Sequence, residues 1–516
     1  MTDILPIVIL FTVGIVTCVY AALKGNNNKQ TKPLKAPLIG DLHRSPIDKP
    51  FLNWDAWAKE NGPIAKPKLF GVIPIIVLNT SEAVTELLSR RSRWYSNRPS
   101  STMVDMVTGA EPGQSKFTLM HDYNANLQIH HRILSPSLGA VGAPRYQPIL
   151  ELESQQLLAH LLAAVDESQN SVVSIKKLYP HFERSQTSMI MMLHYGMRIL
   201  NLDDPLLHQI IDIQARVTNL FSKPKLPDFI PALRHLPAII SPWKRFANKF
   251  FDEQSELYMK LFNYGKTSEG WNATKQTIEA AKKYDESRRL SDIDLGFSVA
   301  TSVHGGMDTS PRQILWLFVA VIQNPEFLLR AHDVLDAVVG RDRPPCFADR
   351  PKLPLIDAAT HELFRWRPIA PGSIPRRADK NDEYRGIKIG KGTTIMANAW
   401  GVGRDESVFD PSLGDLQEYV PERWLVHDGN KCLEKLRSDL PLPVFGQGKR
   451  SCLGKRVAID GMFLQVARLL WAFDVEPLEE VDPWLMEVFG FMIIPKEFRF
   501  RLKPRGPWVR NAISGD

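Results

Sequence analysis

The chain has 516 residues, of which 44% are hydrophobic and 23% charged, proportions that are normal for a globular protein with a sizeable core. The formal net charge of +7 suits a nucleic acid, an anionic lipid, an acidic protein or merely a solvated surface. Because no run of Lys and Arg interleaved with aromatic residues is present, a nucleic-acid partner is not expected.

The cysteine content argues against a disulfide framework and fits a reducing compartment. No two cysteines are spaced as a CxxC zinc or redox pair. The sequons at Asn79 and Asn272 are interpreted as chance matches, because glycosylation requires a lumenal domain. The four cysteines are Cys18, Cys346, Cys432 and Cys452.

The N-terminus predicts a membrane anchor. Residues 4–23 carry no charge, and about 20 helical residues cross the ~30 Å hydrocarbon core of a bilayer. A secretory signal is the rival interpretation, but the basic residues follow the apolar run instead of preceding it. We therefore expect an anchor over 1–24, a linker over 25–50, and a single cytosolic body over 51–516.

The first part of the body mixes short strands with helices. Gly71 separates two runs of strand character, so a hairpin is plausible there. Thr80 or Ser81 would cap the helix that follows. The expected elements are helix 54–61, strands 64–70 and 74–78, helix 81–90, a loop over 100–122, helices 123–135 and 145–166, and amphipathic helices over 180–265 with Pro-rich breaks at 224–242.

The second part of the body predicts mainly long helices. Residues 291–324 show the longest helical pattern, with Ser291 as a plausible N-cap and acidic residues that suit the helix dipole. Further helices are expected over 355–366 and 455–473, with short strands and turns up to about residue 400. The predicted fold class is therefore mainly α, with a small β-sheet region.

The most informative segment runs from Phe445 to Gly454 and reads FGQGKRSCLG. Nearby positive charge and a following helix N-terminus both favour the thiolate form of Cys452. Gly448 and Gly454 would let the backbone approach a flat ligand closely, and Phe445 could shield the sulfur. An isolated cysteine of this kind would more often be a buried structural residue.

The whole segment matches the pattern FxxGxRxCxG at every fixed position, and by it the chain resembles the cytochrome P450 family. With the N-terminal anchor it resembles the membrane-anchored, microsomal type, and its Pro-rich loops resemble fungal members in general style. The resemblance implies the P450 fold behind one transmembrane helix, with haem b as cofactor. It implies Cys452 as the iron ligand and Arg450 as a partner of a haem propionate, with Phe445 and Gly448 completing the cofactor loop.

A second group of residues resembles the structural triad of that family. Glu362 and Arg365 lie three residues apart on one helical face, and Arg423 belongs to a PERW segment some sixty residues later. Glu and Arg at this spacing are equally typical of a surface ion pair. The resemblance assigns all three residues to folding and to support of the haem loop, not to chemistry.

The segment GGMDTS over residues 305–310 lies within the longest predicted helix, although glycine and threonine weaken helices. It resembles the oxygen-binding groove of the family, in which Asp308 and Thr309 relay protons. Pro311 removes one backbone N–H, and we hypothesise that it deepens a kink and frees a carbonyl to hold water. The alternative interpretation of residues 305–310 is a helix that is merely kinked.

One segment departs from the family pattern. Leu127 and His131 stand where the family has Trp and Arg beside the haem propionates. His131 could still donate one hydrogen bond, and an exposed helix residue is the alternative. Arg376 lies where many relatives carry a propionate ligand after proline, so it is a further candidate.

The implied activity is that of an enzyme, an oxidoreductase that inserts one atom of dioxygen into a small apolar substrate such as a terpenoid, polyketide, fatty acid or aromatic. Pocket candidates are Gly305, Gly306, Ile369 and Phe491. The chain has no fingerprint for FAD, FMN or NADPH, so electrons are expected from an NADPH-cytochrome P450 reductase, or from cytochrome b5, on the endoplasmic reticulum membrane. Lys449, Lys455 and Arg456 would attract an acidic docking face.

Three other functions remain open at this point. A haem-thiolate isomerase or dehydratase would need no reductase, but such relatives tend to lack the acid–Thr pair. A non-catalytic membrane-anchored binding protein draws support only from Leu127 and His131. A basic nucleic-acid binder rests on net charge alone, and salt-sensitive DNA binding without haem colour would identify it.

Overall fold

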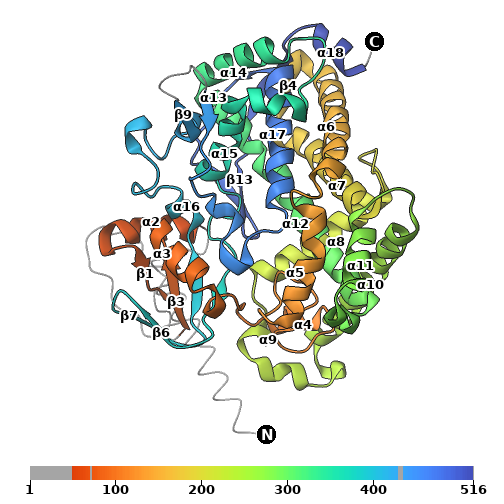
Figure 1. Ribbon diagram of the computed structural model, residues 1–516, viewed down its shortest axis with the longest axis vertical. Coiled ribbons are helices and arrows are strands. Elements are labelled where there is room, and N and C mark those ends of the chain that lie inside the picture. Colours follow the sequence, from red (N-terminus) through yellow and green to blue (C-terminus); the bar gives the residue numbers. More distant parts are fainter. Residues whose placement is uncertain (1–48, 70–72, 428–433, 515–516) are drawn as a thin grey trace.

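A computed structural model describes residues 49–69, 73–427 and 434–514 of the chain, drawn as a coloured ribbon in Figure 1. The predicted anchor over 1–24 and nearly all of the predicted linker lie outside these residues. The body that follows is mainly helical with small sheets, as the sequence predicts.

The helices provide most of the mass, and the strands are short. The α-helices are α2 (Pro50–Asn61), α3 (Ser81–Val84), α4 (Thr102–Met106), α5 (Ala125–Leu138), α6 (Ala143–Asp166), α7 (Ile175–Tyr195), α8 (Pro205–Ser222), α9 (Leu226–Phe229), α10 (Pro242–Thr267), α11 (Ala273–Lys282), α12 (Asp292–Gln313), α13 (Leu315–Gln323), α14 (Pro325–Val338), α15 (Pro354–Trp366), α16 (Ala399–Val402), α17 (Lys455–Ala472) and α18 (Trp508–Ser514). The strands are β1 (Ile64–Ala65), β2 (Lys68–Leu69), β3 (Ile73–Leu78), β4 (Val172–Ser174), β5 (Arg376–Arg377), β6 (Asp382–Tyr384), β7 (Ile387–Ile389), β8 (Thr394–Ala397), β9 (Leu425–His427), β10 (Glu434–Leu436), β11 (Phe473–Pro477), β12 (Met486–Phe489), β13 (Met492–Pro495) and β14 (Arg499–Pro504).

Helices α15 and α17 are buried along most of their length. Helix α12 packs along α7, and α17 packs against α6 and α15, with α12, α15 and α17 in the middle of the molecule in Figure 1. All residues of α15 from Leu355 to Trp366 are buried, including its charged ones. Such burial requires internal partners for each polar group, and these partners build part of the site described below.

The main sheet brings distant segments together. Its strand order is β1-β3-β8-β5, with β2 paired to β3 off this path. Strands β3 and β8 are parallel, whereas β5 runs antiparallel to β8 and places Arg376 opposite Ile395. A further hairpin pairs β12 with β13 and turns at Gly490, whose φ is +65°. The main sheet and β6–β7 lie to one side of the helical body, at the lower left of Figure 1.

The predicted elements are mostly present, with several differences in their limits. The expected strand over 64–70 is divided into β1 and β2 by a segment containing Pro67, and the loop expected over 100–122 contains the short helix α4. The helix expected over 81–90 begins as α3, capped by Thr80, whose side chain accepts from the Ala83 N–H, and continues as a π-helix from Thr85 to Arg90.

The longest predicted helix is two helices. Helix α12 begins at the Ser291 cap, where Ser291 and Asp294 bond each other's backbone N–H groups, and it continues through Pro311 to Gln313. The interruption falls at Ile314, whose carbonyl accepts the Leu317 N–H at 2.9 Å in a tighter, i to i+3 pattern. Pro311 therefore lies inside the last turn of α12 and not at the break.

The structure bears on the two sequons and on the pairing of the cysteines. Asn79 and Asn272 are 4% and 0% exposed, and both side chains are hydrogen-bonded, which supports their interpretation as chance sequons. Cys346 and Cys452, the two cysteines within the described ranges, are both unpaired.

Within residues 49–69, 73–427 and 434–514, no single helix is long and apolar enough for a membrane span. The stretch 292–323 and the helix 325–338 pass that test together, but they are bent by 106° relative to each other.

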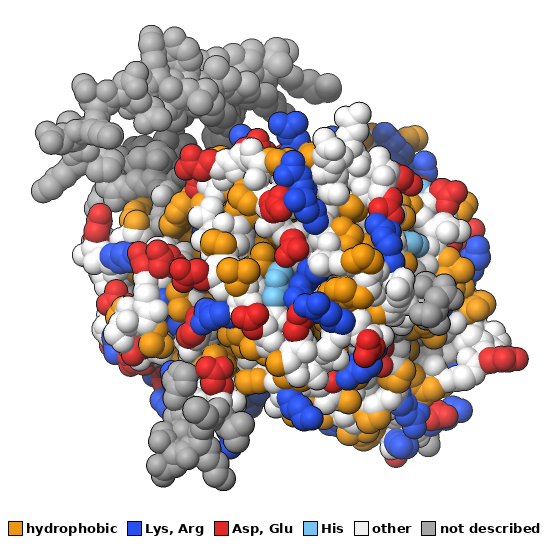
Figure 2. All heavy atoms as spheres, turned by 90° about the horizontal axis from the view of Figure 1, so that it is seen from above, with side chains coloured by type: hydrophobic (Ala, Val, Ile, Leu, Met, Phe, Trp, Pro, Cys, Tyr) orange, Lys and Arg blue, Asp and Glu red, His pale blue; other side chains and the backbone are white. Residues whose placement is uncertain are grey.

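On the face shown in Figure 2, acidic and basic side chains are interspersed, so the positive charge is not gathered into one patch there.

Candidate functional site

The cysteine loop is a compact turn held by its own backbone. The Cys452 N–H donates to the Phe445 carbonyl at 2.8 Å, and the Ser451 N–H donates to the Gly448 carbonyl at 3.1 Å. Helix α17 begins at Lys455, as the sequence predicts. Phe445 is buried, with its ring centroid 4.9 Å from that of Phe364 in an edge-to-face contact. The loop thus anchors Cys452 between the α15 core and the start of α17.

The Cys452 thiol is solvent-accessible although protein atoms surround it. Burial is the largest influence on its pKa and raises it. The N–H groups of Gly454 and Lys455 and the Lys455 charge lower that pKa. These neighbours act in the predicted direction, but burial outweighs them. A metal ion at the sulfur would hold it as the thiolate, since a coordinating thiol is deprotonated outright.

Gly448 makes a close contact that the sequence did not predict. Its φ is +60°, and a Cβ there would collide with the backbone carbonyl oxygen of Leu88. The glycine therefore allows the loop to pass close to the π-helical segment 85–90, and its approach to a flat ligand stays a prediction. At Gly454, the nearest atom to an added Cβ is the Cys452 Sγ at 3.9 Å.

A buried guanidinium cluster lies beside this loop. Arg98, Arg376 and Arg450 are 4%, 4% and 9% exposed. Burial lowers the pKa of each, to about 10 for Arg376 and Arg450, and the mutual repulsion of the cluster lowers the pKa of Arg98 and Arg376 further. Their hydrogen-bond acceptors are the backbone carbonyls of Leu88, Ser96, Thr118, Leu119, His121, Ile374, Pro375 and Gln447.

The charge of this cluster is not balanced within the described residues. None of the three guanidinium groups forms an ion pair with a described carboxylate, and Asp122, the acid whose charge acts on Arg450, is paired with Arg377 at 2.7 Å. Buried positive charge without a partner is costly, so the cluster favours an anion with carboxylate-like oxygens. Arg376 and Arg450 were candidates from the sequence, whereas Arg98 was not, because no motif marked it.

His131 lies near this cluster. Burial, together with the positive charges of Arg450 and Arg98 and the neighbouring His121, lowers its pKa to about 4. The side chain is half-buried, so the alternative of an exposed helix residue does not hold. Leu127, one turn earlier on α5, is fully buried in the core. A neutral imidazole can donate a single hydrogen bond here, where the family pattern has a permanent charge.

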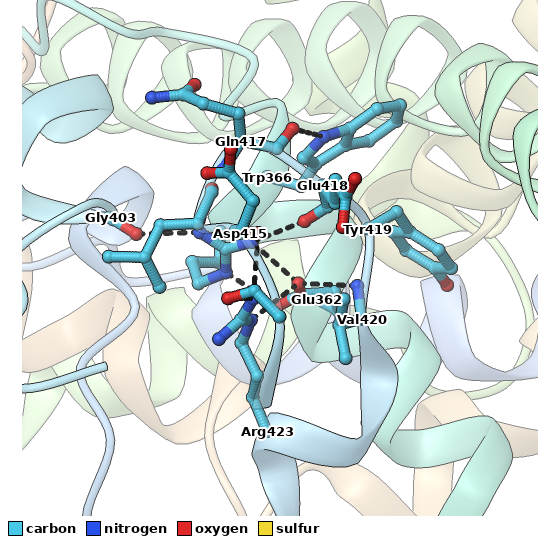
Figure 3. Close-up of polar contacts among 12 residues, drawn as sticks. Glu362, Trp366, Gly403, Asp415, Gln417, Glu418, Tyr419, Val420 and Arg423 are labelled. Atoms are coloured by element: carbon cyan, nitrogen blue, oxygen red, sulfur yellow. Dashed lines mark hydrogen bonds and ion pairs between the residues drawn. The ribbon is translucent and has the colours of Figure 1, made fainter. Parts of the chain in front are cut away.

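The residues of the predicted triad converge. Figure 3 shows this for Glu362 and Arg423, with Val420 beside them. Arg365 donates to both Glu362 carboxylate oxygens, at 2.6 and 2.7 Å, and Arg423 Nε lies 3.7 Å from the same group. The Val420 N–H and the Trp424 indole each donate to Glu362 at 2.9 Å.

Arg365 and Arg423 also donate hydrogen bonds to backbone carbonyls between residues 403 and 418, in the segment that precedes the cysteine loop. Arg365 donates to the carbonyls of Gly403, Leu416 and Glu418, at 2.8 to 2.9 Å. Arg423 donates to those of Asp410, Gly414 and Asp415, at 2.6 to 2.8 Å. The side chains of Glu362, Arg365 and Arg423 are at most 1% exposed, so the triad is a buried scaffold.

The segment 305–310 on α12 presents different residues to different neighbours. A Cβ added at Gly305 would meet nothing within 4 Å, whereas one at Gly306 would lie 2.5 Å from Ile190 Cδ1 on α7. Thr309, one turn after Gly305, donates its hydroxyl to the Gly305 carbonyl at 2.9 Å. The open face is therefore that of Gly305 and Thr309, and Gly306 serves helix packing.

Asp308 does not lie on that open face. It is buried at 5% exposure, and its carboxylate accepts from Gln214 and Thr218 of α8 and pairs with Arg312. The sequence grouped Asp308 with Thr309, but neighbouring residues on a helix point about 100° apart, and here they address different elements.

An Ala scan of the two glycines should separate the two roles. Gly306→Ala is expected to lower the free energy of unfolding by about 1–3 kcal/mol, because the added methyl overlaps Ile190. Adding Ile190→Val, which removes Cδ1, should restore part of that loss in urea unfolding. Gly305→Ala should leave stability unchanged or higher. Equal destabilisation by both single variants would contradict this assignment.

An apolar wall completes the site. Ile369, Ala370 and Met492 form a small buried cluster, against which Val444 and Phe491 pack. The Ile493 N–H donates to the Ile369 carbonyl at 3.0 Å, which fixes the β13 strand to this segment. Val444 lies in the short helical turn that leads into the cysteine loop, so the cluster of Ile369 and Phe491 adjoins that loop. Their role in a substrate pocket stays a prediction.

These residues fit a haem. The accessible sulfur of Cys452 is a suitable axial ligand, and the unbalanced guanidinium cluster of Arg98, Arg376 and Arg450 matches the two carboxylates of the porphyrin. The apolar cluster around Ile369 suits the faces of a macrocycle. Within the described ranges no other group of His, Cys, Asp and Glu is arranged to hold a metal ion.

Comparisons with known proteins point to one family. The family model described as Cytochrome P450 matches residues 31–502. The chain is 31% identical over 483 residues to "Cytochrome P450 monooxygenase FrzL" of Cladobotryum sp, covering 92% of this chain and 87% of that protein. It is 30% identical over 471 residues to "Cytochrome P450 monooxygenase criE" of Aspergillus cristatus, covering 89% and 82%.

Solved structures agree on the fold. A zebra fish cytochrome P450 determined with progesterone superposes with a TM-score of 0.72 at 24% sequence identity, covering 88% of this chain and 99% of that one. At this identity the similarity concerns the fold alone. The expectation of an oxidoreductase enzyme is confirmed by the relatives, which are named as monooxygenases.

Proposed function

Because the chain belongs to the cytochrome P450 family, whose members use a haem iron, we propose that it inserts one atom of dioxygen into an apolar organic substrate while the other leaves as water. The observation that carries the proposal is the accessible Cys452 thiol in its loop, beside three buried arginines that have no acidic partner among the described residues. The required electrons would come from NADPH through a separate flavoprotein reductase.

The bound haem would supply the activation of dioxygen, and the protein would supply position and protons. Cys452 would hold the iron, while Arg98, Arg376 and Arg450 would bind the propionates, with His131 as a further hydrogen-bond donor. The Thr309 hydroxyl lies on the open face of α12 beside Gly305 and is the group placed to pass a proton. Asp308 would support that transfer from the α8 side.

We propose an apolar small-molecule substrate. Ile369, Phe491 and their neighbours form an apolar wall next to the cysteine loop, which favours a ligand with little polar surface. The curated relatives come from fungi. A terpenoid, polyketide or aromatic of secondary metabolism therefore fits best.

The test of the function is the absorption spectrum of the reduced protein with carbon monoxide, followed by NADPH consumption with a reductase. We expect a strongly red-shifted Soret band and product formation that depends on NADPH, reductase and dioxygen. A folded protein without a haem band would overturn the proposal. Turnover of a peroxide without reductase would indicate the isomerase or dehydratase alternative.

The reductase would dock beside the cysteine loop. An open cleft of about 800 Å³ lies there, and its lining includes Leu453, Lys455 and Arg456 together with Arg350 and Lys435. These cations would complement an acidic face on the reductase, and cytochrome b5 would use the same surface. Acidic residues also line the cleft, so the complementarity is local.

Reversing one of these charges should slow electron transfer from the reductase. Lys455→Glu is expected to raise the KM for the reductase several-fold and to weaken its dependence on salt, because rim charges mainly set the association rate. Lys249→Glu, at an 81% exposed position on α10, is the matched control. An unchanged reductase KM in Lys455→Glu, with an intact carbon monoxide spectrum, would argue against this docking face.

We further propose a single-pass attachment to the endoplasmic reticulum membrane through residues 4–23, with the body in the cytosol. A second contact with lipid is supported by the exposed apolar side chains of Leu226, Phe229, Ile230, Ile239 and Ile240, where Ile239 is 84% exposed. Deleting residues 1–24 should move the protein from the membrane to the soluble fraction at high salt. A full-length protein found in the soluble fraction would contradict the attachment.

A further inference from the structure

The carboxylate of Asp308 is held from two sides by neighbours in separate elements. One oxygen pairs with Arg312, four residues later on α12. The other accepts from the Gln214 amide at 3.0 Å and the Thr218 hydroxyl at 3.3 Å, both on α8. Asp308 and Arg312 are 5% and 6% exposed, so their charges are paired in an environment that screens them weakly.

The guanidinium of Arg312 is itself fixed by aromatic rings. Its central carbon lies 4.2 Å from the ring centroid of Phe489 on β12 and 5.1 Å from that of Tyr179 on α7. It also donates to the Asp308 backbone carbonyl at 2.9 Å. These contacts leave Arg312 little freedom to leave the carboxylate.

The β12–β13 hairpin and α8 meet at the same point. A Cβ added at Gly490 would lie 2.6 Å from Thr218 Cγ2 and 2.8 Å from Ser222 Oγ, so the hairpin turn is packed directly on α8. The pair formed by Asp308 and Arg312 is therefore enclosed by three elements besides its own helix, which are α7, α8 and the β12–β13 hairpin.

We propose that Arg312 is a positioning residue that keeps Asp308 ionised and turned toward α8, away from the open face of Gly305 and Thr309. This inference rests on the proposed monooxygenase function, in which Asp308 supports proton transfer. Arg312 thereby sets the pH range over which the carboxylate accepts and returns a proton.

Other titratable groups lie near the pair on the elements packed against it. From α7, Tyr179 donates its hydroxyl to Glu183 at 2.8 Å, and both face Arg312. From α8, His208 acts on Glu183, while the residues that touch Asp308, Gln214 and Thr218, are neutral. The hairpin contributes the neutral ring of Phe489. Arg312 is thus the cation in direct contact with the Asp308 carboxylate.

The test uses the full-length holoprotein with Arg312→Met, which removes the charge, and Arg312→Lys, which retains it. Arg312→Gln is a second neutral variant if the Met variant folds poorly. The first readout is the free energy of unfolding in urea as a function of pH. Without Arg312, burial should raise the folded-state pKa of the Asp308 carboxyl above its unfolded value.

The sign of this effect follows from proton linkage. A raised folded-state pKa means that the folded protein binds a proton that the unfolded chain lacks, so the added stability is present below about pH 4 and is lost as pH rises through the raised value. Arg312→Met should show this decline, and Arg312→Met combined with Asp308→Asn should not. Arg312→Lys should follow the wild type.

The second readout is the ratio of hydrogen peroxide released to NADPH consumed, with reductase and dioxygen and no organic substrate. This ratio should change at least twofold in Arg312→Met and return toward the wild-type value in Arg312→Lys. If both variants match the wild type in the two readouts, or if the pH slope persists with Asp308→Asn, the inference is wrong. A wild-type protein without the red-shifted carbon monoxide band would instead overturn the proposed function.

Discussion

Cys452→Ala is expected to abolish turnover and to remove the red-shifted Soret band of the reduced protein with carbon monoxide. In the proposed function the sulfur is the iron ligand, and its loop is fixed by the hydrogen bond from the Cys452 N–H to the Phe445 carbonyl at 2.8 Å. Alanine preserves that backbone bond but offers no donor atom. The measurement is the spectrum, together with NADPH-dependent product formation.

The matched control is Cys346→Ala, the other cysteine in the described ranges, which is half-buried and unpaired. It should retain both the spectrum and the activity, because it does not belong to the cysteine loop. A red-shifted band that survives in Cys452→Ala would show that another group binds the iron. Loss of secondary structure by circular dichroism would instead point to a folding defect.

Glu362→Gln is expected to cost about 3–5 kcal/mol of unfolding free energy, since it leaves buried arginines without their anion. Glu362 is fully buried and accepts two hydrogen bonds from Arg365 and one each from Val420 and Trp424. A glutamine of equal size presents an N–H₂ group to these donors. Expression yield, haem occupancy and urea unfolding would record the loss.

Glu422→Gln is the matched control in the same short segment. Glu422 is 30% exposed and pairs with the exposed Arg330, so its loss should cost at most about 1 kcal/mol. If Glu362→Gln and Glu422→Gln proved equally stable, the scaffold role of the triad would be wrong. If Glu362→Gln folded normally but failed in turnover, the residue would belong to the chemistry instead.

Motifs with short sequence spacing were predicted well. The cysteine loop, the start of α17 and the cap of α12 at Ser291 depend on contacts within a few residues, which a local pattern can encode. The Glu362–Arg365 pair is likewise three residues apart. Arg423 was placed only through the resemblance, since its contact with Glu362 spans some sixty residues.

The roles of the glycines could not be predicted from their motifs. Gly305 and Gly306 are adjacent, but Gly305 faces open space and Gly306 faces Ile190. Gly448 lies against the Leu88 carbonyl, a contact that its motif did not predict. A glycine in a motif indicates that another group approaches the backbone closely. Which group that is depends on the packing of the folded chain.

By itself, the sequence determined the mainly helical class and which residues form the cysteine loop and the buried triad, while Cys452 as the iron ligand stays a prediction. Only the tertiary structure added Arg98 to the buried arginines, turned Asp308 toward α8 and paired it with Arg312. The physical reason is the separation along the chain of the residues that interact. Periodicity, caps and turns are set by neighbours along the chain, whereas the balance of buried charge depends on segments, such as those around Arg98 and Arg450, that are joined only when the chain packs.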